Sequence, residues 1–150
     1  MRVLGTELYS KGFESAVIDF IEILEGEKKN LLISPSDANV LVHAGMPSVW
    51  ILKIKGSKTA TRVGGPKFFK RIIQETKHLP INHFLCGGAE GVADRLKKEC
   101  NIWGNLNISG TYCPPFKDLS DEEMQSIADV INNSNTSILW VGLGAPKQLY

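Results

Sequence analysis

The stretch that decides the fold is His83-Phe84-Leu85-Cys86-Gly87-Gly88-Ala89-Glu90-Gly91-Val92-Ala93. Its first four residues predict a short buried strand, and the glycine pair that follows predicts a sharp turn. Gly91–Glu99 then predicts a helix. A strand that leads directly into a helix is the repeating unit of α/β proteins, in which the sheet is mostly parallel.

The same alternation continues through the rest of the chain. Helices are expected at Phe13–Leu24, with Gly26 as the stop signal, at Pro66–His78, and from a Ser120/Glu123 capping box to Asn133. A short helix up to His43 has Ser36 or Asp37 as its cap, and Met46–Lys55 is ambiguous with a helix favoured. Strands are expected at Leu31–Ile33, Leu106–Ser109 and Ile138–Gly142, and loops at Thr59–Gly65 and Gly110–Lys117. The prediction is one α/β domain over residues 1–150, Rossmann-like, with a mostly parallel sheet and helices on both faces.

Composition narrows the function classes. The net charge is +1 and the basic residues are scattered among acids, so no nucleic-acid partner is expected. Cys86, Cys100 and Cys113 fit no metal or redox spacing and are expected to be reduced thiols in a cytoplasmic protein. We expect no signal peptide and no membrane span. The apolar residues Val49, Trp50 and Ile51 are expected to be exposed and point to self-association.

Glycines between a strand and a helix allow backbone N–H groups to approach a phosphate at the helix N-terminus. Gly87, Gly88 and Gly91 therefore suit a nucleotide diphosphate, although a plain strand–helix turn explains them equally well. The spacing is not G-x-G-x-x-G, and Asn107-Ile108-Ser109 stands where a dinucleotide-binding fold has its acid. A nicotinamide-dependent enzyme is therefore not expected.

Two further segments suit an anionic, hydrogen-bonding ligand. The loop Gly110–Phe116 holds two prolines and Tyr112, which could stack on a base or sugar; alternatively it is a rigid connector in which Phe116 caps the core. Arg62 precedes a predicted helix beside two glycines, where its planar fork suits a diphosphate; a solvated arginine is an equal alternative.

The last informative stretch is Leu139-Trp140-Val141-Gly142-Leu143-Gly144-Ala145-Pro146-Lys147-Gln148. It predicts a buried strand that delivers a cation and an amide at its carboxyl end, where ligands bind in open parallel sheets. This block resembles the signature of the WecG/TagA/CpsF glycosyltransferases (glycosyltransferase family 26). The resemblance continues in order through five further elements and the opening strand and helix. These are Val3–Leu24, Ser34–Ser36, Gly45–Pro47, Arg62–Phe68, Phe84–Ala93 and Gly110–Phe116.

The resemblance implies transfer of a hexosamine-type sugar, similar to N-acetylmannosamine, from a UDP donor to a polyprenyl-diphosphate-linked acceptor in bacterial surface-polysaccharide synthesis. It implies no metal and no cofactor, a cytoplasmic protein in peripheral contact with the inner membrane face, and a possible homo-oligomer. The catalytic residues that it implies are Ser34, Arg62 and Gln148. The residues that it places around the nucleotide sugar are Gly87, Gly88, Glu90, Gly91, Tyr112, Pro114, Gly144 and Lys147.

The chain departs from the family pattern at three positions. Ala44 stands where the family has its proposed base, an aspartate; Lys67 and Leu149 replace an aspartate and a glutamate. Asp37 is the nearest remaining carboxylate. An internal segment near residue 44 and the family's C-terminal extension are expected to be absent. Three hypotheses follow: an active transferase, a catalytically impaired member that binds a nucleotide sugar or a partner protein, or a remnant that folds poorly because the missing segment leaves apolar surface exposed.

Overall fold

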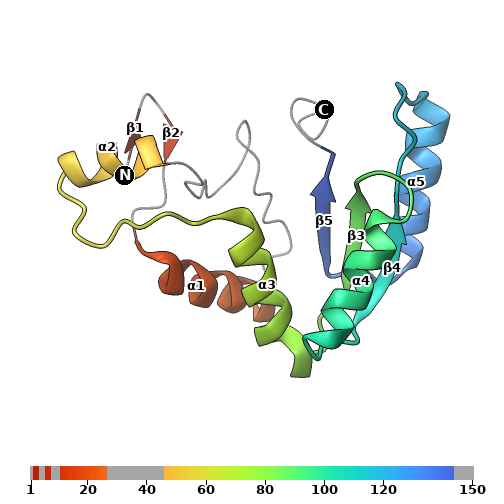
Figure 1. Ribbon diagram of the computed structural model, residues 1–150, viewed down its shortest axis with the longest axis horizontal. Coiled ribbons are helices and arrows are strands. Elements are labelled where there is room, and N and C mark those ends of the chain that lie inside the picture. Colours follow the sequence, from red (N-terminus) through yellow and green to blue (C-terminus); the bar gives the residue numbers. More distant parts are fainter. Residues whose placement is uncertain (1, 4–5, 8–10, 27–45, 144–150) are drawn as a thin grey trace. The chain divides into compact units, whose positions relative to one another are not determined.

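The computed structural model describes residues 2–3, 6–7, 11–26 and 46–143 (Figure 1). The chain forms two compact units, Met1–Ile72 and Ile73–Tyr150. The strand expected at Leu31–Ile33 and the short helix expected up to His43 lie outside the described residues. The expectation of a single domain stays a prediction.

The first unit begins with a two-residue antiparallel pair, β1 (Arg2–Val3) and β2 (Thr6–Glu7), in place of the one opening strand that the resemblance implies. Three helices follow: α1 (Phe13–Glu25), α2 (Met46–Ile54) and α3 (Gly65–Glu75), the last of which continues into the second unit. The helices predicted at Phe13–Leu24, Met46–Lys55 and Pro66–His78 are confirmed, with the α-helical part of the last ending at Glu75. At the end of α1 the Gly26 N–H donates to the Glu22 carbonyl, and a single 3₁₀ turn, η1 (Thr76–His78), extends α3.

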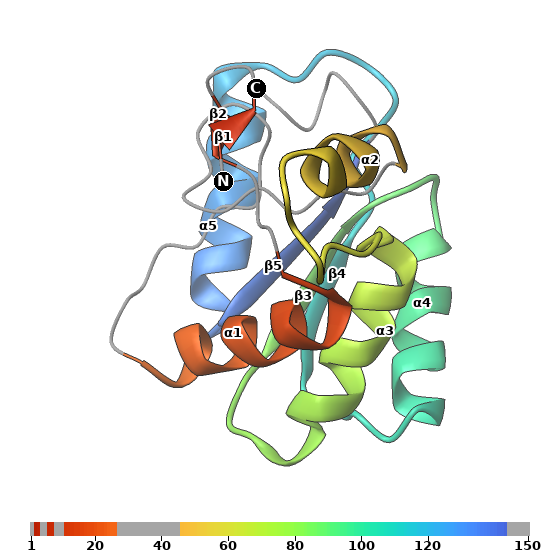
Figure 2. The same cartoon turned by 90° about the vertical axis from the view of Figure 1, so that its left-hand side faces the viewer.

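Aromatic side chains join α1 to α3, which lie side by side in Figure 2. The Phe68 ring meets Phe13 and Phe20 edge-on, with ring centroids 6.4 and 5.5 Å apart. All three side chains are buried, and such edge-to-face pairs add about 0.5–1.5 kcal/mol each beyond area burial. The Phe13 N–H donates to the Thr61 hydroxyl at 3.0 Å, which satisfies one of the open donors at the start of α1.

The second unit is a three-stranded parallel sheet. Its strands are β3 (His83–Gly87), β4 (Ile108–Tyr112) and β5 (Ile138–Gly142), in the order β4-β3-β5. Helix α4 (Val92–Ile102) connects β3 to β4, and α5 (Asp121–Asn133) connects β4 to β5. All five residues of β3 are buried, because it lies between two strands. The predicted Rossmann-like α/β fold is confirmed.

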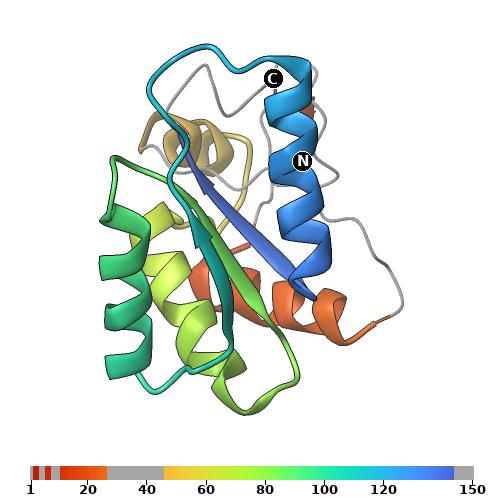
Figure 3. The same ribbon diagram turned by 90° about the vertical axis from the view of Figure 1, so that its right-hand side faces the viewer.

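The two helices of the second unit cover opposite faces of the sheet (Figure 3). Neighbouring residues of a strand point to opposite faces, and β4 shows which helix each face meets. The Thr111 hydroxyl donates to Asp94 of α4 at 2.6 Å, whereas the next residue, Tyr112, lines a hollow together with α5. The chain therefore leaves β3 toward one face and β4 toward the other.

A network of polar side chains centred on His83 of β3 connects this strand to η1 and to β5. The Trp140 indole N–H donates to Nδ1 of His83 at 3.0 Å, and Nε2 of His83 lies 2.8 Å from the Thr76 hydroxyl. An indole nitrogen can only donate, so Nδ1 accepts and Nε2 carries the proton. The Asn105 amide donates to the Ile73 carbonyl at 2.7 Å and to the Thr76 hydroxyl at 3.3 Å. The ring of His83 is therefore held neutral in one tautomer.

The strand expected at Leu106–Ser109 is present but displaced along the chain, since β4 begins two residues later, at Ile108, and ends three residues later, at Tyr112. The Asn107 N–H donates to the side-chain oxygen of the buried Asn105 at 2.9 Å, and this local turn keeps Leu106 out of the strand and exposed. Gly110, which the sequence predicts as the start of a loop, lies inside β4. The Phe84 ring crosses this position, and a Cβ there would lie 2.4 Å from the ring, so glycine is required.

Helix α2 corrects one expectation about exposure. Trp50 and Ile51 are exposed, but Val49 is buried, with only 2% of its surface accessible. None of the helices that the structure describes has the length and apolarity needed to cross a bilayer.

We predict that His83 makes folding weaken in mild acid. Burial lowers the pKa of His83 from 6.5 to about 4, so between these values the unfolded chain binds the extra proton and the folded chain does not. The stabilisation is complete above about pH 6.5 and declines as the pH falls toward 4, by roughly 3 kcal/mol in all. Urea unfolding measured across this range should show the decline in the native chain. The decline should become shallower in His83→Gln and persist in His78→Gln, whose side chain is exposed. Nitrogen-resolved NMR that found His83 protonated at Nδ1 near neutral pH would contradict the network.

Candidate functional site

The carboxyl ends of the three parallel strands meet at one edge of the second unit. Gly87 of β3 pairs with Gly142 of β5, and Cys86 pairs with Tyr112 of β4. Beyond the strand ends, the Gly88 N–H donates to the Gly142 carbonyl at 3.2 Å, and the Cys113 thiol donates to the Gly87 carbonyl at 3.5 Å. These contacts hold the strand ends together, so the loops after β3 and β4 begin at fixed positions.

This edge has the geometry in which open α/β sheets bind ligands. The loops after β3 and β4 depart to opposite faces of the sheet, because α4 and α5 lie on opposite faces. A crevice between adjacent strand ends results from such a reversal, and ligands bind there in doubly wound folds. The sequence prediction placed its glycine loop and its Tyr112 loop at this edge, and the structure brings both there.

Each glycine of the β3–α4 loop has a specific reason to be glycine. Gly87, Gly88 and Gly91 all have positive φ, at 134°, 77° and 77°. A Cβ on Gly87 would lie 2.5 Å from the Gly142 carbonyl oxygen, and one on Gly88 would lie 2.7 Å from Val92. A Cβ on Gly91 would meet nothing within 4 Å. Packing therefore explains the first two glycines, whereas Gly91 begins α4 as an N-cap without a side-chain hydrogen bond and leaves the space in front of it open.

Two carboxylates, those of Glu90 and Asp94, lie near the start of α4. Glu90 is exposed in the loop, and Asp94 in the first helical turn accepts a hydrogen bond from Thr111. Negative side chains stabilise a helix N-terminus, but they also repel a phosphate. Carboxylates accept hydrogen bonds from hydroxyl groups, so this part of the edge suits the hydroxyls of a sugar or ribose better than a diphosphate.

Tyr112 faces α5. It lines a hollow of about 140 Å³ whose other residues come from the following loop and from α5: Pro115, Leu119, Glu123, Ser126, Ile127 and Val130. Its lining combines apolar side chains with the polar groups of Tyr112, Ser126 and Glu123. Pro114 is half-buried in the same loop. The alternative in which Phe116 caps the core is wrong, because 98% of its side chain is exposed.

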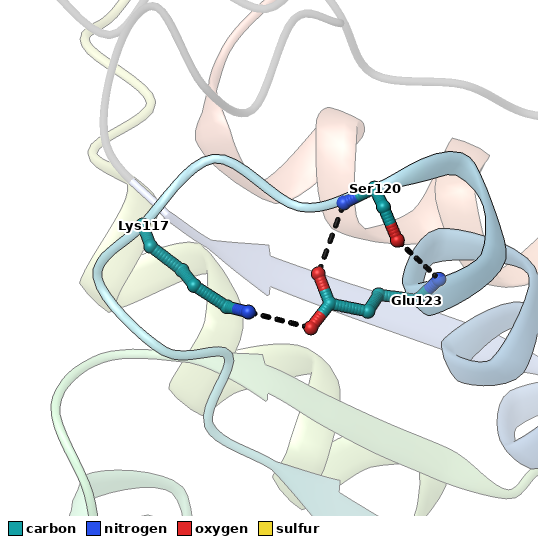
Figure 4. A network of polar contacts seen from close by, with 3 residues as sticks. All are labelled: Lys117, Ser120 and Glu123. Atoms are coloured by element: carbon teal, nitrogen blue, oxygen red, sulfur yellow. Dashed lines mark hydrogen bonds and ion pairs between the residues drawn. The ribbon is translucent and has the colours of Figure 1, made fainter.

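Polar contacts hold the loop between β4 and α5 (Figure 4). Lys117 lies 2.6 Å from one carboxylate oxygen of Glu123, whose other oxygen accepts from the Ser120 N–H at 2.9 Å. The Glu123 N–H in turn donates to the Ser120 hydroxyl, which completes the predicted capping box. The hydrogen bond from Lys117, followed by that from the Ser120 backbone, lowers the pKa of Glu123. The loop that carries Pro114 and Phe116 is therefore tied down at its far end.

Cys86 lies at this edge, whereas Cys100 lies in the last turn of α4. Burial, with a smaller contribution from the neighbouring Cys113, raises the pKa of Cys86. Burial also raises the pKa of Cys100 to about 11. Both thiols are protonated at neutral pH and therefore are poor nucleophiles. Across residues 2–3, 6–7, 11–26 and 46–143, no three His, Cys, Asp or Glu side chains gather as a metal site would require.

The remaining candidate residues fall into two groups. Arg62 lies in the first unit, exposed, between Thr61 and the buried Val63. Lys67, which departs from the family pattern, lies with its Nζ 4.6 Å from the centre of the Phe13 ring. The others lie outside the described residues: Ser34, Asp37, Ala44, Gly144, Lys147, Gln148 and Leu149.

The positions of two residues at this edge, Asp94 and Phe116, were not predicted from the sequence. Asp94 appears in sequence only as an ordinary acid near a helix start, and its pairing with Thr111 depends on the register of β4. Phe116 is an exposed aromatic ring on a stiffened loop, next to the place where a ring was predicted to stack. The Cys-Pro-Pro-Phe run signals a rigid loop but does not show which way its aromatic residue points.

Fold and edge together define a class: the doubly wound α/β proteins, a class in which ligands bind at the carboxyl ends of the parallel strands. Within that class, residues 18–149 match the Glycosyl transferase WecG/TagA/CpsF family. The chain belongs to this family, and the resemblance seen in its sequence is confirmed. No curated protein matches the chain.

We predict that alanine at Gly87 is far more damaging than alanine at Gly91. Both positions have positive φ, but only at Gly87 does a methyl group overlap backbone atoms of β5. Gly91→Ala should cost about 1–2 kcal/mol for its backbone conformation alone. Gly87→Ala should cost more than about 3 kcal/mol, because strain and overlap add. Urea unfolding of the two variants measures the difference. Equal losses would show that β3 and β5 do not approach as closely as described.

Proposed function

We propose that the chain transfers a hexosamine-type sugar, similar to N-acetylmannosamine, from a UDP donor to a polyprenyl-diphosphate-linked acceptor in bacterial surface-polysaccharide synthesis. The observation that carries the proposal is the family match over residues 18–149, which includes the whole carboxyl edge of the sheet. We place the reaction at the cytoplasmic face of the inner membrane, with no metal and no cofactor.

In such a transfer an acceptor oxygen attacks the anomeric carbon of the donor sugar. The bond between that carbon and the diphosphate oxygen breaks, UDP leaves with the bonding electrons, and the acceptor proton passes to a base. Catalysis therefore requires a base at the acceptor and positive charge or hydrogen-bond donors at the departing diphosphate.

We assign the sugar-side contacts to the β3–α4 loop. Glu90 and Asp94 would accept hydrogen bonds from hydroxyl groups of the ribose or hexosamine, and the open space before Gly91 would admit them. The aromatic contact to the base would come from the loop after β4, through Tyr112 or the exposed Phe116. The remaining donor-side roles follow the family pattern: Gly87, Gly88, Pro114, Gly144 and Lys147 line the nucleotide site, Arg62 and Gln148 steady the diphosphate or sugar, and Ser34 lies near the transferred group.

A second candidate function follows from the residue at the base position. Alanine cannot accept a proton, and Ala44 occupies the place of the family's proposed aspartate. Asp37 is the carboxylate that would replace it. Without a replacement the chain would be a catalytically impaired member that binds a nucleotide sugar or a partner protein. The transferase and a member that only binds the nucleotide sugar share the donor site and differ at the acceptor.

We predict that UDP binds and that Arg62 contributes to its affinity. A charge-assisted contact to a diphosphate is worth about 1.5–3 kcal/mol, so Arg62→Ala should raise the dissociation constant by roughly tenfold to a hundredfold. Calorimetric titration with UDP measures both. Arg71→Ala is the matched control: it removes the same charge from an exposed position whose ion pair with Glu14 is at the surface. Absence of saturable binding by the folded chain would reject both the transferase and the member that binds a nucleotide sugar, and would leave only the binding of a partner protein.

Restoring the base separates the two functions. If the donor site is intact and only the proton acceptor is missing, Ala44→Asp should raise sugar transfer by about 10²–10⁴-fold, the range for a positioned general base. Release of UDP from UDP-N-acetylmannosamine in the presence of a lipid-linked acceptor reports the rate. Ala44→Asn controls for size. A rate that is already high in the native chain and unchanged in Ala44→Asp would favour another base, with Asp37→Asn as the next variant.

A further inference from the structure

Helix α2 presents apolar side chains on two opposite sides. Val49 and Leu52 are buried, with 2% and 0% of their surfaces accessible. Trp50, Ile51 and Ile54 are exposed at 58%, 37% and 86%. At helical spacing these three side chains share the side that is opposite to Val49 and Leu52. A helix with apolar side chains on opposite sides is normally covered on both sides. The side of α2 that carries Trp50, Ile51 and Ile54, its outer face, therefore needs a partner; the helix is gold in Figure 2.

Lysines flank this outer face. Lys53 lies beside Ile54 on the last turn of the helix, and Lys55 and Lys58 follow directly. All three side chains are exposed. Among the described residues, Lys53 and Lys58 form no ion pair. A long lysine stem can lie along apolar surface while its ammonium group stays in a polar layer.

The stretch of sequence from α2 through most of α3 carries charge of one sign. Residues 46–74 contain no aspartate or glutamate, in a chain whose net charge is only +1. The basic residues of this stretch are Lys53, Lys55, Lys58, Arg62, Lys67, Lys70 and Arg71. Arg71 pairs with Glu14, and Lys67 lies over the Phe13 ring. Lys53, Lys55 and Lys58 are therefore the basic residues of this stretch that lie closest in sequence to the exposed apolar side chains of α2.

We propose that the outer face of α2 is a docking surface for an anionic lipid bilayer. Trp50 would lie at the headgroup level, where indole rings are favoured, and Ile51 and Ile54 would enter the acyl boundary. Lys53 and Lys58 would lie among the anionic headgroups, which attract basic residues next to a membrane-bound helix. A second copy of the chain fits less well, because pairing two such faces would bring their lysines together. Nucleic acid would leave the isoleucines without a partner.

This surface deepens the proposed function in one respect, since a lipid-linked acceptor would lie in the same bilayer. Its test needs neither donor nor acceptor. Loss of UDP binding or of transfer would therefore leave the docking surface standing, and failure of docking would leave the proposed transfer untouched.

The test is co-sedimentation of the full chain with vesicles of phosphatidylcholine alone or with about a third of phosphatidylglycerol. We expect binding to the anionic vesicles only, weakened at least tenfold as salt rises from about 0.1 to 0.5 M, because attraction to surface charge falls off within a Debye length. Ile54→Ser should weaken binding about tenfold, and Lys53→Gln with Lys58→Gln by a similar factor.

Matched controls come from the second unit. Ile102→Ser removes an isoleucine that is 75% exposed on α4, and Lys77→Gln with Lys98→Gln removes two exposed lysines. These variants should bind as the native chain does, within about twofold. Circular dichroism and the unfolding midpoint should be unchanged in Ile54→Ser. Three results would overturn the proposal: equal binding to neutral and anionic vesicles, equal losses in the α2 and control variants, or an oligomer that Ile54→Ser dissociates while no vesicle binding is seen.

Discussion

The arrangement of the second unit depends on how closely the two outer strands, β4 and β5, approach the central strand, β3. At the carboxyl end a Cβ on Gly87 would overlap the Gly142 carbonyl, and in the middle the Phe84 ring fills the space that a side chain on Gly110 would take. At the other end His83 accepts from Trp140 of β5 and is bound to Thr76. These contacts fix the register of all three strands, and the register determines which residues reach the carboxyl edge of the sheet.

The donor site that we propose follows from this register. The register of β4 brings Thr111 to Asp94 on one face of the sheet and turns Tyr112 toward α5 on the other. The β3–α4 loop then offers carboxylates to hydroxyl groups, whereas the β4–α5 loop offers apolar and aromatic surface held by the Lys117, Ser120 and Glu123 contacts. A nucleotide sugar needs both kinds of surface. The positive charge for its diphosphate has to come from elsewhere in the chain, and Arg62 and Lys147 are the family-derived candidates.

Most of the fold was predictable from sequence because its signals are local. Glycine pairs end β3, the capping box starts α5, and helical spacing of Phe13, Val17 and Phe20 marks α1. The errors arose where a distant residue decides the local structure. Gly110 resembles a loop residue until the Phe84 ring is placed across it, and Leu106 resembles a strand residue until Asn105 turns inward to bind Ile73 and Thr76. In the same way Val49 could not be separated from Trp50 by composition, because only packing shows which side of α2 is covered. For the candidate site, sequence located the loops but not the directions of Tyr112, Phe116 and Asp94, which depend on strand register.

The central claim is that the carboxyl edge of the β4-β3-β5 sheet receives the nucleotide sugar. Amide chemical shifts of the ¹⁵N-labelled chain, recorded during titration with UDP, test it most directly. The account predicts that the largest saturable shifts belong to the backbone amides around Gly88, Gly91 and Cys113, while amides at the opposite ends of the strands, around Asn82 and Ser137, stay unchanged. Saturable shifts confined to other parts of the chain would contradict it.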